Sequence, residues 1–95
     1  MALYVLTCLD KPDSADLRAA TREAHLAFIA NNRAMVKIAG PFLNESGGPV
    51  GSLLILEAES LIEVETFAAT DPYAVAGLFA SAEIRPWRIT VGAFA

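Results

Sequence analysis

The sequence predicts an α+β fold in which two helices cover one face of an antiparallel sheet. Runs of apolar and β-branched residues at 3–9, 35–43, 51–58 and 84–94 are typical of strands. Longer stretches that begin with helix-start residues follow the first and the third of these runs. The resulting order is β-α-β-β-α-β, the ferredoxin-like arrangement.

The first half of the chain predicts a strand and then a long helix. The strand over 3–9 ends at the polar, proline-containing segment 10–13. Asp13 or Ser14 can cap the following helix, because short polar side chains accept hydrogen bonds from the free amides of the first turn. We expect this helix to run to about residue 32.

The middle of the chain predicts a hairpin. The strand over 35–43 contains Gly40-Pro41, which indicates an edge position or a bulge, since proline cannot donate to a sheet ladder. Residues 44–49 are rich in Asn, Gly and Pro and predict the connection. The third strand then occupies 51–58.

The last part of the chain predicts a second helix and a final strand. Ser60 and Glu63 have the Ser-x-x-Glu spacing of a capping box, so a helix is expected from there to about residue 69. A short helical turn is expected after Asp71-Pro72. The fourth strand is expected over 84–94.

Composition and charge exclude some classes of function. The chain has 95 residues, which suit a single domain, and a net charge of −4, which argues against a general affinity for nucleic acid. No apolar run approaches the ~20 residues of a membrane span, and the start lacks the pattern of a secretory signal. The lone Cys8 is expected to pack as a small hydrophobe, a usage that suits the reducing cytoplasm.

The hydrophobic content predicts a second copy of the chain as partner. With helices on one face only, strands should alternate apolar and polar residues. Segments 3–6 and 53–56 are instead apolar at every position, so both faces of the sheet are expected to be buried. We therefore expect a homodimer formed through the sheet face.

His25 is the candidate for chemistry, because it is the only histidine and histidine titrates closest to neutral pH. On a helical wheel the core-facing stripe is predicted to be Leu17, Thr21, Ala24 and Phe28. His25 lies on the border of this stripe, with Arg18 and Arg22 on its solvent side. Arginines at such an edge suit an anionic small molecule, since a guanidinium can hold a carboxylate through two hydrogen bonds. The alternatives are a structural histidine bonded to a backbone carbonyl, and arginines that are solvated or paired with acids.

Asp71 has two interpretations. Asp followed by Pro is a good helix start, so Asp71 can simply cap the next turn. It can also orient the imidazole of His25 through a hydrogen bond and raise its basicity. One carboxylate is able to do both.

Aromatic residues could wall a pocket beside His25. The candidates are Tyr73, Phe79 and Trp87, with Phe42 a further one, although such aromatic residues more often pack in the core than contact a ligand. The hydroxyl of Tyr73 could donate to a substrate oxygen. One histidine and one cysteine without ligand spacing give no recognisable metal site, and phosphate-loop and nucleophile-elbow patterns are absent.

The chain resembles the YciI-like (YCII-related) family over nearly its whole length. The landmarks are Arg22-Glu23-Ala24-His25-Leu26, Ala39-Gly40-Pro41, Gly48 to Ser52, Asp71-Pro72-Tyr73, Gly77-Leu78-Phe79 and Ile84-Arg85-Pro86-Trp87. The resemblance implies a ferredoxin-like dimeric α+β barrel with an active site on a His and an Asp, which correspond to His25 and Asp71. One member of the family eliminates chloride from a hydroxylated aromatic ring.

Three functions compete on these residues. The first is an enzyme in which His25, oriented by Asp71, is general base or acid in an isomerisation, elimination or similar proton transfer, without an organic cofactor. Its substrate would be a small anionic or ring-containing metabolite, held by Arg18, Arg22, Tyr73 and Trp87. The second is a non-catalytic binding or sensing module that uses the same cavity. The third is a structural dimer domain.

Overall fold

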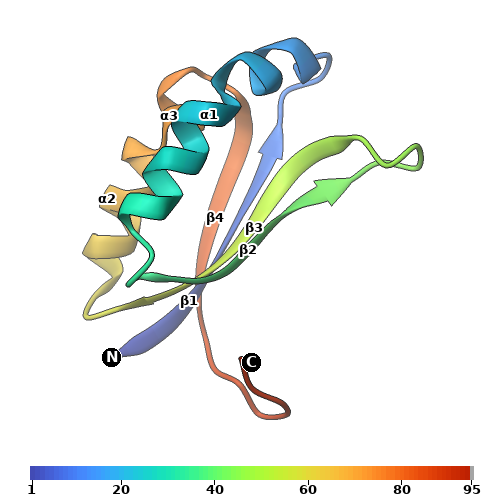
Figure 1. Cartoon of the computed structure of the whole chain (residues 1–95). Coiled ribbons are helices and arrows are strands. Elements are labelled where there is room, and N and C mark those ends of the chain that lie inside the picture. The colour runs from blue at the N-terminus through green and yellow to red at the C-terminus, as the bar shows by residue number, and fades with distance from the viewer. Residues whose placement is uncertain (95) are drawn as a thin grey trace.

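A computed structural model, which describes residues 1–94, places the helices on one side of a four-stranded sheet (Figure 1). Its elements are β1 (Ala2–Asp10), α1 (Ala15–Asn31), β2 (Val36–Leu43), β3 (Pro49–Ala58), α2 (Leu61–Thr70), α3 (Pro72–Val75) and β4 (Phe79–Trp87). The strand order is β2-β3-β1-β4, and every neighbouring pair is antiparallel. The predicted ferredoxin-like α+β fold is confirmed.

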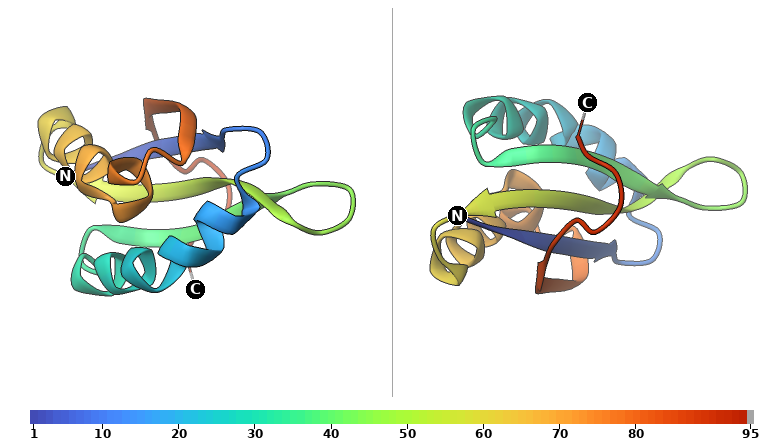
Figure 2. Two further views of the ribbon diagram at one scale, coloured as in Figure 1. Left: turned by 90° about the horizontal axis from the view of Figure 1, so that it is seen from above. Right: turned by 90° about the horizontal axis from the view of Figure 1, so that it is seen from below.

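The helices form two groups above the sheet. Figure 2 shows α1 over the β2 side of the sheet, while α2 and α3 lie over the β1–β4 side. The core lies beneath them and is formed by alternate residues of the two central strands with one face of α2: Tyr4, Leu6, Cys8, Leu54, Leu56, Val64 and Phe67. The period of two in burial along β1 and β3 matches the alternation of side chains across a sheet.

The opposite face of the sheet is also apolar, but it carries no helix. Val5 pairs with Ile55 and Thr7 pairs with Leu53 there, and these side chains are only half-buried. Ile38 on β2 lies beside Ile55 and is exposed. Because β1 and β3 are apolar on both faces, the single chain has a hydrophobic sheet face that no helix covers.

The final strand lies earlier in the sequence than predicted. The expected range was 84–94, whereas β4 is Phe79–Trp87. The reason is the position of the partner strand: Trp87 pairs with Leu3, close to the start of β1, so residues 88–94 have no strand to pair with. This segment runs away from the helices beyond the end of β4 (Figure 1).

The predicted edge strand is confirmed, whereas the predicted caps of α1 and α2 are not formed. Gly40-Pro41 lies in β2, which is an edge strand with a register irregularity on either side of this pair. Ser14 precedes α1 and Ser60 precedes α2, but neither side chain makes the capping hydrogen bond. Glu63 instead accepts a hydrogen bond from the backbone amide of Glu59, the residue before the helix cap, so neither bond of the predicted capping box is formed.

The buried face of α1 differs from the predicted stripe. Leu17 and Ala24 are exposed, whereas Arg18 is buried. The helix lies over the β2–β3 side of the sheet (Figure 2). The surface of α1 that faces these strands lines a cavity.

Candidate active site

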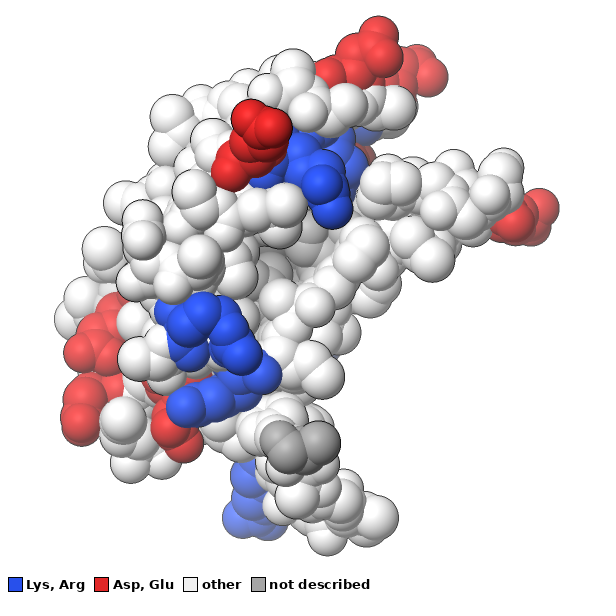
Figure 3. Space-filling view, in the orientation of Figure 1, with Lys and Arg blue, Asp and Glu red and all other residues white. Residues whose placement is uncertain are grey.

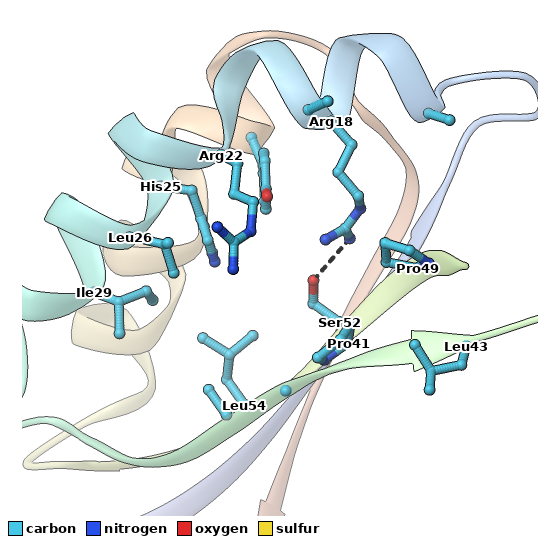
Figure 4. A pocket seen from close by; sticks show the side chains of 15 residues that line it. Arg18, Arg22, His25, Leu26, Ile29, Pro41, Leu43, Pro49, Ser52 and Leu54 are labelled. Atoms are coloured by element: carbon cyan, nitrogen blue, oxygen red, sulfur yellow. Dashed lines mark hydrogen bonds between the residues drawn. The ribbon is translucent and has the colours of Figure 1, made fainter. Parts of the chain in front are cut away.

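A cavity of about 470 Å³ lies between α1 and the strands β2 and β3. Figure 3 shows the hollow as a largely uncharged surface with basic side chains at its upper rim. In Figure 4, Arg18, Arg22 and His25 point into it from α1, while Leu54 and Pro41 face them from the strands. The residues that line it are Ala15, Arg18, Ala19, Arg22, His25, Leu26, Ile29, Ala39, Gly40, Pro41, Leu43, Pro49, Ser52, Leu54 and Tyr73.

Asp71 joins α3 to the histidine of α1. Its Oδ1 lies 2.8 Å from Nδ1 of His25 and its Oδ2 lies 3.1 Å from the same nitrogen. Oδ1 also accepts a hydrogen bond of 2.9 Å from the backbone amide of Tyr73, so Asp71 caps the short helix as well. The carboxylate is 3% exposed. Asp71 therefore caps the short helix and contacts the imidazole of His25 through one shared oxygen.

This contact fixes which nitrogen of His25 is available. A neutral imidazole that donates from Nδ1 to a carboxylate carries its lone pair on Nε2. Nε2 has no hydrogen-bond partner among residues 1–94, and none of their buried side-chain nitrogen or oxygen atoms lacks a partner, so Nε2 is accessible. The ring points into the cavity (Figure 4). The basic nitrogen therefore faces the space where a ligand would lie.

Tyr73 supports the imidazole from the protein side. Its ring stacks on that of His25, with 4.0 Å between centroids and 16° between planes, and Phe79 meets its edge at 6.0 Å. Tyr73 is 1% exposed. Burial raises the pKa of the phenol, while the guanidinium charges of Arg18 and Arg22 oppose that rise. The hydroxyl is thus protonated near neutral pH and able to donate.

Arg18 is held by four hydrogen bonds at one end of the cavity. Its Nε and Nη2 donate to the two carboxylate oxygens of Asp10 at 2.7 and 3.1 Å, and Nη2 also donates to the carbonyl of Gly51 and to Oγ of Ser52. Its Cζ lies 4.7 Å from the ring centroid of Tyr73. Burial acts to lower the pKa of Arg18, but the hydrogen bond and charge of Asp10 outweigh it and raise the pKa. Of the alternatives for Arg18, pairing with an acid is found and solvation is not, because Asp10 and two strand oxygens compensate its burial.

Gly51 makes this arrangement possible. A Cβ at this position would lie 2.5 Å from the carbonyl oxygen of Cys8, which is closer than real side chains approach. Only glycine lets β3 come this near to β1 while its carbonyl accepts from Arg18. The close contact between the strands therefore sets the position of the guanidinium.

Arg22 differs from Arg18 in its surroundings. Its side chain lines the cavity from the next turn of α1, and the residue is exposed. Within residues 1–94 it makes no ion pair and no side-chain hydrogen bond. Its charge is therefore available to a ligand that enters from solvent.

The aromatic residues divide between the site and other places. Tyr73 lines the cavity, whereas Phe79 lies behind Tyr73. The expected role of Trp87 was wrong: it lies opposite Leu3 at the far end of β4 and is 42% exposed. Phe42, the further candidate, does not line the cavity either. The strand walls are aliphatic instead.

Sequence reasoning missed Asp10 and Ser52. Asp10 was assigned to the loop after the first strand, although it is the last residue of β1 and turns its carboxylate to α1. Ser52 stands as a polar residue in the otherwise apolar run of β3 and is 5% exposed. A polar residue in a buried strand calls for a hydrogen-bond partner, and this pattern was the available indication.

The buried thiol of Cys8 is not ionised near neutral pH. Burial, followed by the charges of Asp71 and Asp10, raises the pKa of the Cys8 thiol to about 12, so it is protonated and buried in the core. In the part of the chain that the structure describes, no group of three or more His, Cys, Asp or Glu is placed to hold a metal ion.

None of the helices in residues 1–94 is long and apolar enough to cross a membrane.

One solved structure is similar to this chain in both sequence and fold, and a second is similar in fold alone. The 5-chloro-2-hydroxyhydroquinone dehydrochlorinase TftG of Burkholderia phenoliruptrix AC1100, solved with 2,5-dihydroxybenzoquinone, is 35% identical with a TM-score of 0.84, over 90% of this chain and 93% of that one. An antibiotic biosynthesis monooxygenase is 11% identical with a TM-score of 0.57, over 96% of this chain and all of that one, and shares the fold alone. The chain thus closely resembles an enzyme that acts on a small molecule.

Sequence relatives agree. Protein YciI of Escherichia coli O6:H1 is 35% identical over 94 residues, which cover 90% of this chain and 96% of the relative. An uncharacterized protein of Haemophilus influenzae is 32% identical over 93 residues, which cover 90% of this chain and 95% of that one. The model of the YCII-related domain matches residues 2–88. The chain therefore belongs to the YCII-related family.

Proposed function

We propose that this protein is an enzyme that transfers a proton on a small anionic or ring-containing metabolite. His25 acts as general base or acid through Nε2, and Asp71 orients the ring and stabilises the imidazolium that forms. The observation that carries this proposal is the 2.8 Å contact between Asp71 and Nδ1, which leaves Nε2 toward the cavity. The reaction class is isomerisation, elimination or a similar step that depends on one positioned base.

The other cavity residues indicate the substrate class. Arg22 offers an uncompensated positive charge at the opening, and Tyr73 offers a protonated hydroxyl. The aliphatic strand residues, among them Pro41 and Leu54, suit the flat faces of a ring. A cavity of about 470 Å³ accommodates a substituted single ring, since drug-sized ligands occupy roughly 300–1,000 Å³.

The similarity to the dehydrochlorinase supports the same class of chemistry. That enzyme is 35% identical, and its structure contains 2,5-dihydroxybenzoquinone. Hydroxylated quinones and hydroquinones are therefore the first compounds to test with this chain. Removal of a proton beside a leaving group is a step that a single oriented histidine can perform.

The direct test is a screen of hydroxylated aromatic and other small acidic metabolites for turnover by wild type, His25→Asn and Asp71→Asn. We expect turnover of at least one compound by wild type and its loss in His25→Asn. Equal turnover by His25→Asn would refute the catalytic role. A metabolite that binds tightly and is recovered unchanged after long incubation would favour the alternative, a non-catalytic binding or sensing module on the same scaffold.

We further propose that the working form is a homodimer that packs the helix-free sheet faces together. Val5, Leu53 and Ile55 on that face are apolar and half-buried in one chain, and Ile38 beside them is exposed. A second copy would bury this continuous surface, which a monomer leaves in water. Placement in the cytoplasm belongs to the same proposal, in keeping with the single unpaired cysteine.

A further inference from the structure

The cavity has two distinct polar ends. Arg18 and His25 are seven residues apart on α1, which places their backbones about 10 Å apart along the helix axis. Figure 4 shows Arg22 between them, with all three side chains directed toward the strands. Tyr73 contacts both ends, through its stack with His25 and its ring contact with the guanidinium of Arg18. A ring-sized ligand along this wall would meet a base at one end and a guanidinium at the other.

Hydrogen bonds fix the guanidinium of Arg18 before any ligand binds. Four hydrogen bonds occupy its Nε and Nη2, on Asp10, Gly51 and Ser52. The hydroxyl of Tyr73 also contributes a hydrogen bond to the guanidinium. Nη1 donates to none of the three residues Asp10, Gly51 and Ser52. Because Arg18 lines the cavity, this N–H group is the part of the guanidinium left for a ligand. A donor already fixed in place needs no rearrangement when charge develops next to it.

We propose that Arg18 stabilises negative charge on the substrate at the end remote from His25, which makes a conjugated planar acid the substrate class of this site. This inference rests on the proposed function of His25. Nε2 of His25 takes the proton, and the electron pair of the broken bond to hydrogen enters the conjugated system. The charge reaches an oxygen beside Nη1 of Arg18. His25 becomes an imidazolium facing Asp71 and later returns the proton to another atom of the substrate.

Asp10 and Ser52 are positioning residues in this scheme. Asp10 fixes the plane of the guanidinium with two hydrogen bonds, and Ser52 holds Nη2 from the floor of the cavity. A purely structural role would make the same cluster a link between α1 and the strands β1 and β3. That role affects stability, whereas charge stabilisation also changes how a bound acid ionises.

The ionisation of bound 4-nitrophenol separates the two roles without any need for turnover. Its phenol ionises near neutral pH with a visible colour change, and the charge of the phenolate spreads through the ring to the nitro oxygens at the opposite end. The experiment titrates the probe in the presence of saturating full-length protein. We expect the acid dissociation constant of the bound probe to rise about tenfold over that of the free probe, as for an acid in contact with a guanidinium.

Variants assign the effect to Arg18. Arg18→Met with Asp10→Asn removes both charges together, and we expect most of the tenfold increase to disappear. Ser52→Ala keeps the ion pair and should lose a smaller part of it; this variant decides the matter if the double variant does not fold. Arg88→Met is the matched control, because Arg88 is exposed after the end of β4 and does not line the cavity; it should behave as wild type.

Clear results would overturn the inference. The first is that the probe does not bind to wild type. The second is that the bound probe ionises as it does in water. The third is that folded Arg18 or Ser52 variants raise the acid dissociation constant of the bound probe as much as wild type does. Failure of the proposed function would give a different result: His25→Asn would retain turnover, while the acid dissociation constant of the bound probe would still depend on Arg18.

Discussion

Asp71 and His25 form the contact on which the site is built, with Oδ1 2.8 Å from Nδ1 across two helices. The same oxygen accepts the amide of Tyr73, so the start of α3 and the orientation of the imidazole depend on one carboxylate. The stack of Tyr73 on His25 completes the arrangement. Local helix capping thus places a partner for a histidine that lies 46 residues earlier in the chain.

Replacement of His25 by Asn should lower turnover of an identified substrate by about 10²–10⁴-fold, the usual contribution of a general base. Asn keeps a polar side chain of similar reach but has no titratable nitrogen. Steady-state kinetics measure the effect, and Thr21→Ala, one turn earlier on α1, is the control that should retain activity. A fall in both variants alike would point to damage of α1 rather than loss of the base.

Two substitutions at Asp71 should separate its tasks. Asp71→Asn keeps a capping oxygen but loses the carboxylate charge, so activity should fall while stability changes little. Asp71→Ala loses both and should cost about 1 kcal/mol or more of unfolding free energy in addition. Urea denaturation and kinetics on the two variants check this. Equal activity in Asp71→Asn and wild type would contradict the orienting role.

The ion pair of Arg18 and Asp10 predicts a strong non-additivity. Both side chains are less than one tenth exposed, so Arg18→Met alone leaves Asp10 as an unpaired buried charge and should cost about 3–5 kcal/mol. Adding Asp10→Asn should recover part of that loss. A double-mutant cycle by urea denaturation measures the coupling. Additive costs would show that the two side chains do not act as a pair.

The helix-free sheet face predicts a variant that disrupts the dimer. Ile55→Lys places a charge on the half-buried apolar face beside Val5, and it should shift a dimer toward monomer. Ile62→Lys on the exposed side of α2 is the matched control and should leave the assembly unchanged. Sedimentation velocity or light scattering measures the mass. A monomeric wild type would remove the basis of this prediction.

The thiol of Cys8 predicts a loss of stability at high pH. Its pKa is raised from 9.0 to about 12 by burial first, then by Asp71 and Asp10. A raised native-state pKa means that the unfolded chain ionises first. The contribution is therefore fully present below pH 9.0 and is lost as pH rises toward 12. Urea denaturation of wild type and Cys8→Ala on both sides of pH 9.0 tests it, because the variant should lack this part of the decline.

The sequence by itself determined the element order, the edge strand and the candidate pair. Hydrophobic patterning and turn residues are local, so β-α-β-β-α-β order followed from them, and the Gly40-Pro41 pair marked β2 as an edge. Helical spacing placed His25 on the border of α1, and Asp-Pro indicated the cap at Asp71. The family landmarks then connected these two residues.

Only the tertiary structure decided the rest, because it depends on partners far apart in the chain. The end of β4 follows from where β1 begins, since a strand without a partner has no ladder, so Trp87 ends the strand far from the cavity. The burial of Arg18 requires Asp10 and Ser52 from two strands, which no periodicity along α1 reveals. Periodicity shows which residues share a face, whereas packing decides whether that face meets the core, solvent or a cavity.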